Sequence, residues 1–107
     1  AGGVVVQAHP GHAKRSGLSV DAHRAWVESY LSALVSDGLT GLEVRRVHHD
    51  VNATHWAAAL AAQHGLLTTA GSDWHGGRWP GEVPVGTNGL SDAEWDALNR
   101  ALDDRSA

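Results

Sequence analysis

The sequence predicts an α/β chain with about three parallel strands and flanking helices. Short runs rich in Val and Leu are typical of strands, and segments with helical periodicity separate one run from the next. Strands that alternate with helices in this way form right-handed β–α–β units and a mainly parallel sheet. Each unit needs about 30 residues, so about three units fit in the chain. Three strands cannot close a barrel, so the predicted sheet is open, paired with another chain, or a fraction of a larger barrel.

The first half of the chain predicts a strand, a helix and a second strand. Residues 3–9 read GVVVQAH, a run of β-branched residues that we expect to form a strand buried on both faces. A helix follows over about 20–36, with Ser19 as its N-cap and Gly38 as its stop. A short second strand starts with residues 41–44. The residues expected on the apolar face of the helix are Ala22, Trp26, Tyr30, Ala33 and Leu34.

The second half predicts a helix, a strand, a loop and a last helix. The Ala-rich segment 56–63 is expected to be helical, with Asn52 or Thr54 as candidate caps. A third strand covers 66–70, and a glycine-rich loop follows it. Residues 91–94 read SDAE, a capping box that predicts the start of the last helix. The expected apolar face of this helix consists of Trp95, Leu98, Ala101 and Leu102.

Composition excludes several classes of protein. The 107 residues fit one domain, which we expect to cover residues 1–107. No apolar run approaches the ~20 residues of a membrane span and no signal peptide is visible, so we expect a cytoplasmic protein without a membrane partner. The chain has no cysteine, which rules out disulfides and thiolate ligands. The net charge of −4 argues against binding nucleic acid by phosphate neutralisation alone, whereas eight histidines suggest metal or proton chemistry.

Three potential metal ligands follow the carboxyl ends of predicted strands. His9 ends the first strand, and Asp73 and His75 follow the third. Ligands of α/β folds bind at this edge of the sheet, so we expect the three side chains to converge. Imidazole and carboxylate groups suit Zn²⁺, Mn²⁺ or Fe²⁺, and three protein ligands leave a position open for water. The alternative is that both histidines are ordinary residues on a hydrated edge.

Three segments together resemble a known family. VVVQAHPGH, GLTGLEVRRVHHD and GLLTTAGSDWHGG, in this order and spacing, are similar to the C-terminal part of the PHP (polymerase and histidinol phosphatase) domain of metal-dependent phosphoesterases. The resemblance implies a distorted seven-stranded barrel of β/α units, of which this chain supplies about three strands. It also implies two or three divalent ions at the carboxyl ends of the strands, with His9, Asp73 and His75 among their ligands.

The same resemblance implies that other metal ligands lie outside this chain. The family begins with a strand that carries a His-x-His pair, and no such pair occurs in the chain, which starts at Ala1. We therefore expect residues 1–107 to be the C-terminal portion of the domain, as a fragment or as one chain of a cleaved or split protein. Its expected partner is the missing N-terminal part, and the fragment alone is expected to be inactive.

Two further polar residues are expected to support the ligands. Glu43 lies within an apolar strand, where an unpaired carboxylate is costly, so it needs a metal, Arg45 or a histidine as a partner. We favour support of the ligands over direct ligation for Glu43. His49 is expected either to contact substrate, to orient a ligand, or simply to be exposed.

The loop after the first strand and the tryptophans bear on the substrate. Relatives often carry a phosphate-binding arginine where this chain has His12, and Lys14 or Arg15 could replace the lost charge. Trp74 and Trp79 flank the predicted metal edge and could stack on a nucleobase. The other tryptophans, Trp26, Trp56 and Trp95, are expected in the core, and His23, His55 and His64 on the surface.

The expected function is hydrolysis of phosphate esters by a metal-activated water. The substrate would be a phosphorylated small molecule or a short nucleic acid, such as a nucleotide or an oligonucleotide. His75 is the expected proton donor to the leaving oxygen, in addition to being a ligand. Two alternatives stay open. One is a non-catalytic metal-binding or interaction module with a decayed site, and the other is hydrolysis of a carbon–nitrogen bond, because metal-bearing β/α barrels also host amidohydrolases.

Overall fold

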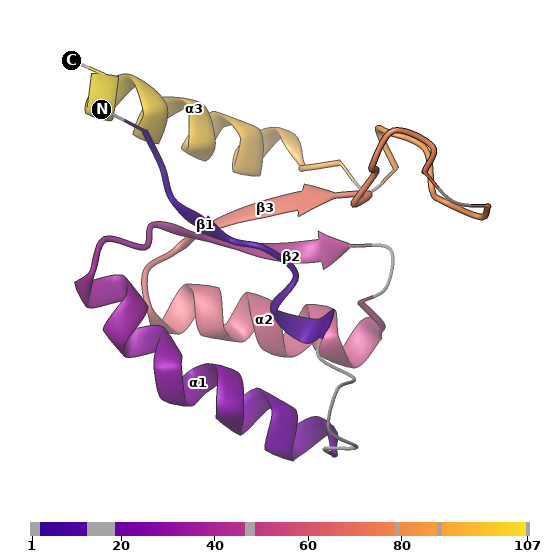
Figure 1. The fold of residues 1–107 in the computed structure, drawn as a ribbon. Helices are drawn as coiled ribbons and strands as arrows, with labels where there is room; N and C mark the ends of the chain where they lie inside the picture. The colour runs from indigo at the N-terminus through magenta and orange to yellow at the C-terminus, as the bar shows by residue number, and fades with distance from the viewer. Residues whose placement is uncertain (1–2, 13–18, 47–48, 79, 88, 107) are drawn as a thin grey trace.

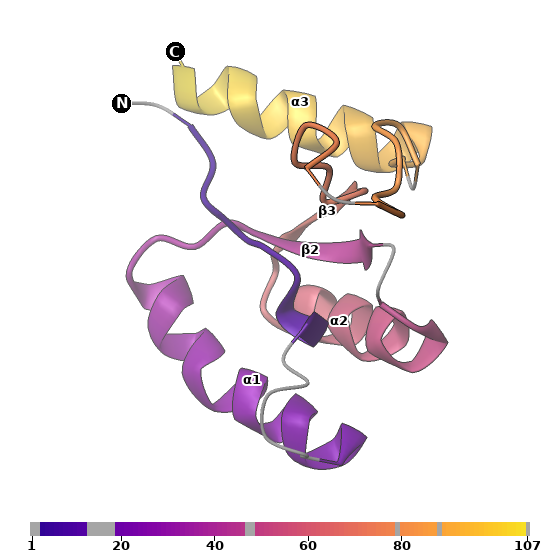
Figure 2. The same ribbon diagram turned by 45° about the vertical axis from the view of Figure 1, so that its right-hand side comes forward.

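The computed structural model describes residues 3–12, 19–46, 49–78, 80–87 and 89–106. In chain order, the elements are β1 (Val6–Gln7), the 3₁₀ turn η1 (Pro10–His12), α1 (Val20–Ser36), β2 (Gly41–Arg46), α2 (Val51–Gln63), β3 (Leu67–Gly71) and α3 (Asp92–Ser106). The three strands form one parallel sheet, with α1 and α2 on one face and α3 on the other (Figures 1 and 2). The predicted α/β class, with three parallel strands and flanking helices, is confirmed.

The central strand β2 sets the register of the sheet. It pairs in parallel with β1 on one side and with β3 on the other. Gly41 lies opposite both Val6 and Leu67, so the carboxyl ends of all three strands reach the same edge. A bulge interrupts the pairing with β3 between Glu43 and Arg45. Bulges re-aim the side chains next to them, and this one directly precedes the edge where the predicted ligands lie.

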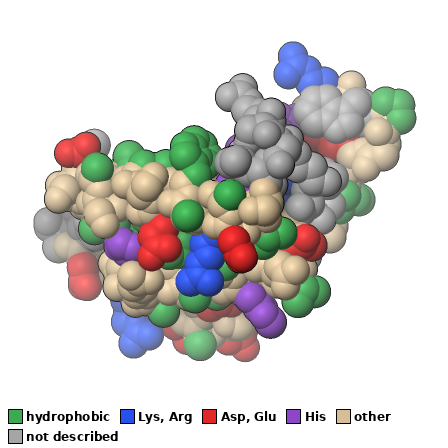
Figure 3. Space-filling view, turned by 90° about the horizontal axis from the view of Figure 1, so that it is seen from below, with side chains coloured by type: hydrophobic (Ala, Val, Ile, Leu, Met, Phe, Trp, Pro, Cys, Tyr) green, Lys and Arg blue, Asp and Glu red, His purple; other side chains and the backbone are tan. Residues whose placement is uncertain are grey.

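The hydrophobic core fills the space between the sheet and the α1–α2 layer. Leu42 and Val44 of β2 are buried against Val27 and Leu31 of α1 and against Leu60 of α2. The outer surface of the two helices carries basic, acidic and histidine side chains interspersed with apolar ones (Figure 3). None of the helices, as far as the structure describes them, combines the length and apolarity that crossing a membrane requires.

The buried face of α1 is shifted by one position along the helix from the predicted face. Val27 and Leu31 are fully buried and His23 is nearly so, whereas Trp26 is 52% exposed. Trp26 packs edge-on against Tyr30 instead, with the ring centroids 5.2 Å apart. Both stripes of the helix are apolar, and the compact side chains of Val27 and Leu31 are the ones that pack closely against the sheet. The predictions that Trp26 lies in the core and His23 on the surface are therefore wrong.

Helix α2 begins earlier than predicted, at Val51. Its N-cap is Asp50, whose carboxylate accepts a hydrogen bond from the Ala53 backbone N–H at 2.7 Å. Asn52 and Thr54 are inside the helix, so neither is the cap. Trp56 is buried in the core as predicted. Among the remaining histidines, His55 is exposed as predicted and His64 is only partly exposed.

Strand β1 is shorter and less buried than predicted. Only Val6 and Gln7 pair with β2, and both are partly exposed. Val5, the neighbouring residue, is 60% exposed. In the described residues β1 is an edge strand that pairs with β2 alone. Because its side chains are partly exposed, the expectation of a strand buried on both faces is wrong for this chain.

Polar contacts attach α3 to the sheet. The predicted capping box is present: the Glu94 N–H donates to Ser91 Oγ at 3.2 Å, and the Ser91 N–H donates to Glu94 Oε1 at 2.9 Å. The Glu94 carboxylate also forms an ion pair with Arg45 of β2 and accepts a hydrogen bond from Thr68 of β3 at 2.7 Å. Trp95 is 50% exposed, so the expectation that it packs in the core is wrong. Hydrogen bonds, rather than burial of this indole, anchor the first turn of α3.

Replacing Leu31 by Ala is expected to lower the free energy of unfolding by about 2–5 kcal/mol, because the change leaves a cavity in a fully buried part of the core. Trp26→Ala is the matched control on the same helix. It should cost much less, because half of the indole is already exposed to water. Chemical denaturation of both variants measures the difference. Equal losses for the two variants would contradict this assignment of the buried face.

Glu94 makes the free energy of unfolding depend on pH in the acidic range. The hydrogen bond from Arg45, with those from Ser91 and Thr68, lowers the pKa of Glu94 from 4.5 to about 2 despite partial burial. Its contribution to stability is therefore fully present above about pH 4.5 and is lost as the pH falls towards 2. We expect the melting temperature of Glu94→Gln to decline less between pH 5 and pH 2.5 than that of the unsubstituted protein. Parallel declines would show that Glu94 is not linked to folding.

Candidate metal centre

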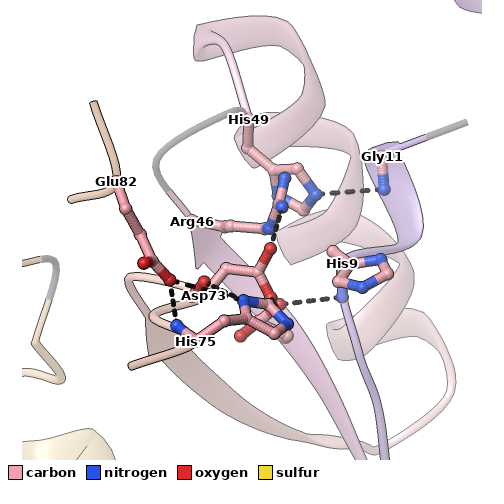
Figure 4. Close-up of polar contacts among 8 residues, drawn as sticks. His9, Gly11, Arg46, His49, Asp73, His75 and Glu82 are labelled. Atoms are coloured by element: carbon pink, nitrogen blue, oxygen red, sulfur yellow. Dashed lines mark hydrogen bonds and ion pairs between the residues drawn. The ribbon is translucent and has the colours of Figure 1, made fainter. Parts of the chain in front are cut away.

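Side chains from the ends of all three strands gather at the carboxyl edge of the sheet (Figure 4). His9 follows β1, His49 follows β2, and Asp73 and His75 follow β3. Arg46, the last residue of β2, points into the same group (Figure 4). The three predicted ligands, His9, Asp73 and His75, thus come from segments far apart in the chain and lie at one edge.

Glu43 holds the backbone of His9. The His9 N–H donates a hydrogen bond to Glu43 Oε1 at 2.8 Å. A Cβ added at Gly71 would lie 3.1 Å from Glu43 Oε2, so the glycine leaves room for this carboxylate at the end of β3. Arg45 was one of the partners expected for Glu43, but its guanidinium pairs with Glu94 instead, because it leans towards α3. Glu43 of β2 therefore holds the backbone of the residue that follows β1, beside the end of β3.

His49 fastens the 3₁₀ turn that follows His9. Its side chain is buried, with Nδ1 2.8 Å from the Val44 carbonyl oxygen and Nε2 accepting a hydrogen bond from the Gly11 N–H at 3.0 Å. Burial lowers the pKa of His49, and the electrostatic effects of Arg46 and His9 lower it further, whereas the Val44 carbonyl and the Glu43 carboxylate raise it. The ring is therefore neutral near pH 7, with its proton on Nδ1. Simple surface exposure of His49 is excluded.

Asp73 is paired with a buried arginine. Arg46 Nη2 donates to Asp73 Oδ2, and the Arg46 side chain is 1% exposed while that of Asp73 is 29% exposed. Burial alone would raise the pKa of the Asp73 carboxyl, but the hydrogen bond and charge of Arg46, together with His75 and His9, lower it below its usual value. Asp73 is therefore ionised at neutral pH, with Oδ1 facing the His75 side of the edge at 3.9 Å from His75 Nε2.

A second carboxylate orients His75. The backbone N–H of His75 donates to Glu82 Oε1, and the N–H of Arg78 donates to Glu82 Oε2 at 2.8 Å. The Glu82 side chain is only 4% exposed, so its carboxylate is buried within the loop whose backbone it binds. His75 Nδ1 lies 2.6 Å from the carbonyl oxygen of Asp73. With Nδ1 on this carbonyl, Nε2 is the ring nitrogen that faces Asp73 Oδ1.

The backbone is strained at two of the predicted ligands. His9 has a φ of 28° and Asp73 a φ of 55°, and in the described part of the chain they are the two non-glycine residues with positive φ. Each such conformation costs on the order of 1–3 kcal/mol and is common at functional sites. The contacts of Glu43 and Arg46 hold both residues in place against this cost. Backbone strain therefore coincides with two of the three predicted ligands.

The donor types at the edge suit a divalent ion, but they do not form a complete metal site. A histidine that ligates a metal usually places its other ring nitrogen on a carbonyl or carboxylate, as His75 does with Asp73. Within the residues that the structure describes, however, no group of three or more His, Asp or Glu side chains is arranged to hold an ion. In the described residues the edge therefore holds donor groups of suitable type without a formed metal site.

Several predicted substrate contacts cannot be placed at this edge. The backbone of His12 belongs to η1, and its side chain lies outside the described part of the structure. Lys14, Arg15 and Trp79 also lie outside the described residues. The phosphate-binding and stacking roles expected for them stay predictions.

Comparison with known proteins gives the relationship of the chain. A curated 3′,5′-nucleoside bisphosphate phosphatase of Chromobacterium violaceum is 35% identical over 82 residues, which are 77% of this chain and 25% of that protein. A solved structure from Bifidobacterium adolescentis, described as a metal-dependent phosphoesterase, superposes with a TM-score of 0.72 and 36% identity over 94% of this chain and 32% of that one. The chain is homologous to part of the PHP phosphoesterases. No family model matches it.

The PHP relationship covers the predicted motifs, but the chain spans only a quarter to a third of these relatives. Two further residues of this edge, Arg46 and Glu82, were not predicted from the sequence. Arg46 carried a usable signal, because a charged residue that continues the alternation of Leu42 and Val44 points to the buried face and needs a carboxylate partner. Glu82 lies in an irregular loop between Gly81 and Val83, where no pattern indicates burial.

Arg46→Met is expected to weaken the binding of divalent metal about 10- to 100-fold, because Asp73 loses the partner that orients its carboxylate. The measurement is a chelator competition in a protein that contains the whole metal site, at a temperature where circular dichroism shows the variant folded. Arg45→Met is the matched control on the same strand. It loses the contact with Glu94 and should leave metal affinity unchanged. Equal or tighter metal binding by Arg46→Met would mean that Arg46 competes with the metal for Asp73.

Proposed function

We propose that residues 1–107 form the C-terminal portion of a PHP-type domain and supply part of its metal centre, in an enzyme that hydrolyses phosphate esters. The observation that carries this proposal is the meeting of His9, Asp73 and His75 at one edge, with backbone strain at two of them. Homology to phosphoesterases supports the same reaction class. The missing N-terminal part of the domain would supply the remaining ligands.

The residues at the carboxyl edge of the sheet have defined roles in the proposal. Asp73 Oδ1 and the imidazoles of His9 and His75 are the metal ligands, for two or three Mn²⁺, Zn²⁺ or Fe²⁺ ions in the complete site. Such ions supply an activated water and neutralise charge on the phosphoryl oxygens. Arg46 keeps Asp73 ionised and in one orientation. His75, whose side chain is 44% exposed, binds a metal through Nε2 or, where Nε2 instead carries a proton, donates that proton to the leaving oxygen; the two roles are alternatives for one ring.

A nucleotide is the substrate class that we propose. The related C. violaceum protein is named for its action on 3′,5′-nucleoside bisphosphates, and this supports a nucleotide or a short oligonucleotide over other phosphate esters. The acidic chain has a formal charge of −4, so binding of such an anion depends on the metals and on local contacts rather than on net charge.

One observation favours a second candidate, a non-catalytic module with a decayed metal site. In the described residues Asp73 is already neutralised by Arg46, and no ready-made group of three ligands is present. Metal counting on the complete protein separates the two candidates. Two or three equivalents with turnover of a phosphate ester support the enzyme, whereas one metal without turnover supports the module.

Asp73→Asn tests the proposed centre most directly, because it keeps the shape of the side chain and removes its charge. We expect turnover of a phosphate ester to be abolished in the complete protein. Metal affinity should fall by more than the about 10- to 100-fold that loss of a supporting partner costs. Metal content by mass spectrometry and a phosphate-release assay measure both effects. His55→Gln, at an exposed position of α2, is the control and should change neither. Unchanged activity of Asp73→Asn would remove Asp73 from the site.

A further inference from the structure

A cavity of about 450 Å³ lies beside Asp73, between the carboxyl end of β3 and the segment that leads into α3. Its volume is within the ~300–1,000 Å³ of small-molecule sites. We propose that this cavity binds the organic part of the phosphate ester and selects a planar ring, with Trp74 as the stacking surface. This inference rests on the function proposed above. The lining residues that carry the argument are Gly71, Asp73, Trp74, Val85, Thr87 and Gly89.

The charge of the cavity favours a neutral group over a phosphate. No Lys or Arg is among its described lining residues, and Asp73 is the one charged residue there. The Asp73 carboxylate is already paired with Arg46, behind the lining. A phosphate would therefore find no cation in the cavity itself. Asp73 also belongs to the predicted metal edge, so one substrate can place its phosphate at that edge and its uncharged ring in the cavity.

The shape and polarity of the lining suit a flat heteroaromatic ring. Trp74 is 50% exposed and lines the cavity, so part of its indole is accessible to a ligand there. A Cβ added at Gly86 or Gly89 would meet nothing within 4 Å, so these glycines leave the cavity open beside the indole. The Thr87 hydroxyl donates to the Pro84 carbonyl at 2.9 Å, which leaves its lone pairs able to accept from a ring amino group. Stacking on an indole and one hydrogen bond are the contacts that a nucleobase needs.

Two carboxylates hold the walls of the cavity in place. On one side the Gly89 carbonyl accepts a hydrogen bond from Arg45 Nη2 at 3.2 Å, and Arg45 is fixed by its ion pair with Glu94. On the other side Glu82 binds the backbone N–H groups of His75 and Arg78, which follow Trp74 in the loop. These contacts restrain the walls of the cavity, which lowers the cost of ordering them when a ring binds.

The test compares two phosphate esters in the complete, metal-loaded protein. Adenosine 3′,5′-bisphosphate carries a planar ring, and glycerol 3-phosphate does not. We expect the ratio of kcat/KM for the first ester to kcat/KM for the second to fall about 10- to 100-fold in Trp74→Ala, mainly through KM, because one stacked base is lost. Trp74→Phe keeps a planar ring and should recover most of the ratio. Trp95→Ala is the matched control, because Trp95 is equally exposed but does not line the cavity, and it should leave the ratio unchanged.

A binding measurement separates this inference from the proposed function. Isothermal titration of metal-free protein with adenosine, which has no phosphate, should show binding that Trp74→Ala weakens by a similar factor. Trp74-dependent binding of adenosine without turnover of either ester would support the cavity and overturn the enzyme. Turnover with the same substrate ratio in Trp74→Ala, or adenosine binding that ignores the substitution, would overturn the cavity.

Discussion

The parallel pairing of β2 with both of its neighbours is the constraint on which the rest of the structure depends. Parallel strands end at one edge, so residues that are more than 60 positions apart in the sequence, His9 and Asp73, are brought to the same edge. His9 reaches this edge from β1, and Asp73 and His75 reach it from β3. The α1–α2 layer packs against β2 and holds the sheet in place. The predicted ligands follow the strands of this sheet.

Buried or half-buried charges organise the edge because each has a defined partner. Glu43 accepts from the backbone of His9, Glu82 accepts from the loop that carries His75, and Arg46 binds Asp73. Unpaired charges in these positions would be strongly destabilising, so the partners restrict the backbone to one arrangement. The same contacts that stabilise the loops therefore position the predicted ligands.

Much of the fold could be predicted from the sequence, and the errors have specific physical causes. The class, the order of the elements and the capping box at Ser91 follow from local patterns that short segments carry by themselves. The face of α1 was wrong because two neighbouring stripes, through Trp26 and through Val27, are both apolar, and only packing against the sheet chooses between them. The first strand was predicted in the right place, but its burial on both faces was wrong, because burial depends on which elements pack against the strand.

The chemical groups that follow the strands are set by the amino-acid sequence: an imidazole after the first strand, and a carboxylate and an imidazole after the third. The tertiary structure alone decided their partners. Arg46 binds Asp73, His49 uses both of its ring nitrogens to bind the backbone, and Glu82 binds the backbone of the loop after β3. These contacts are consequences of long-range packing. Periodicity and spacing report on neighbours along the chain, whereas hydrogen bonds between distant segments depend on how the sheet and helices are assembled.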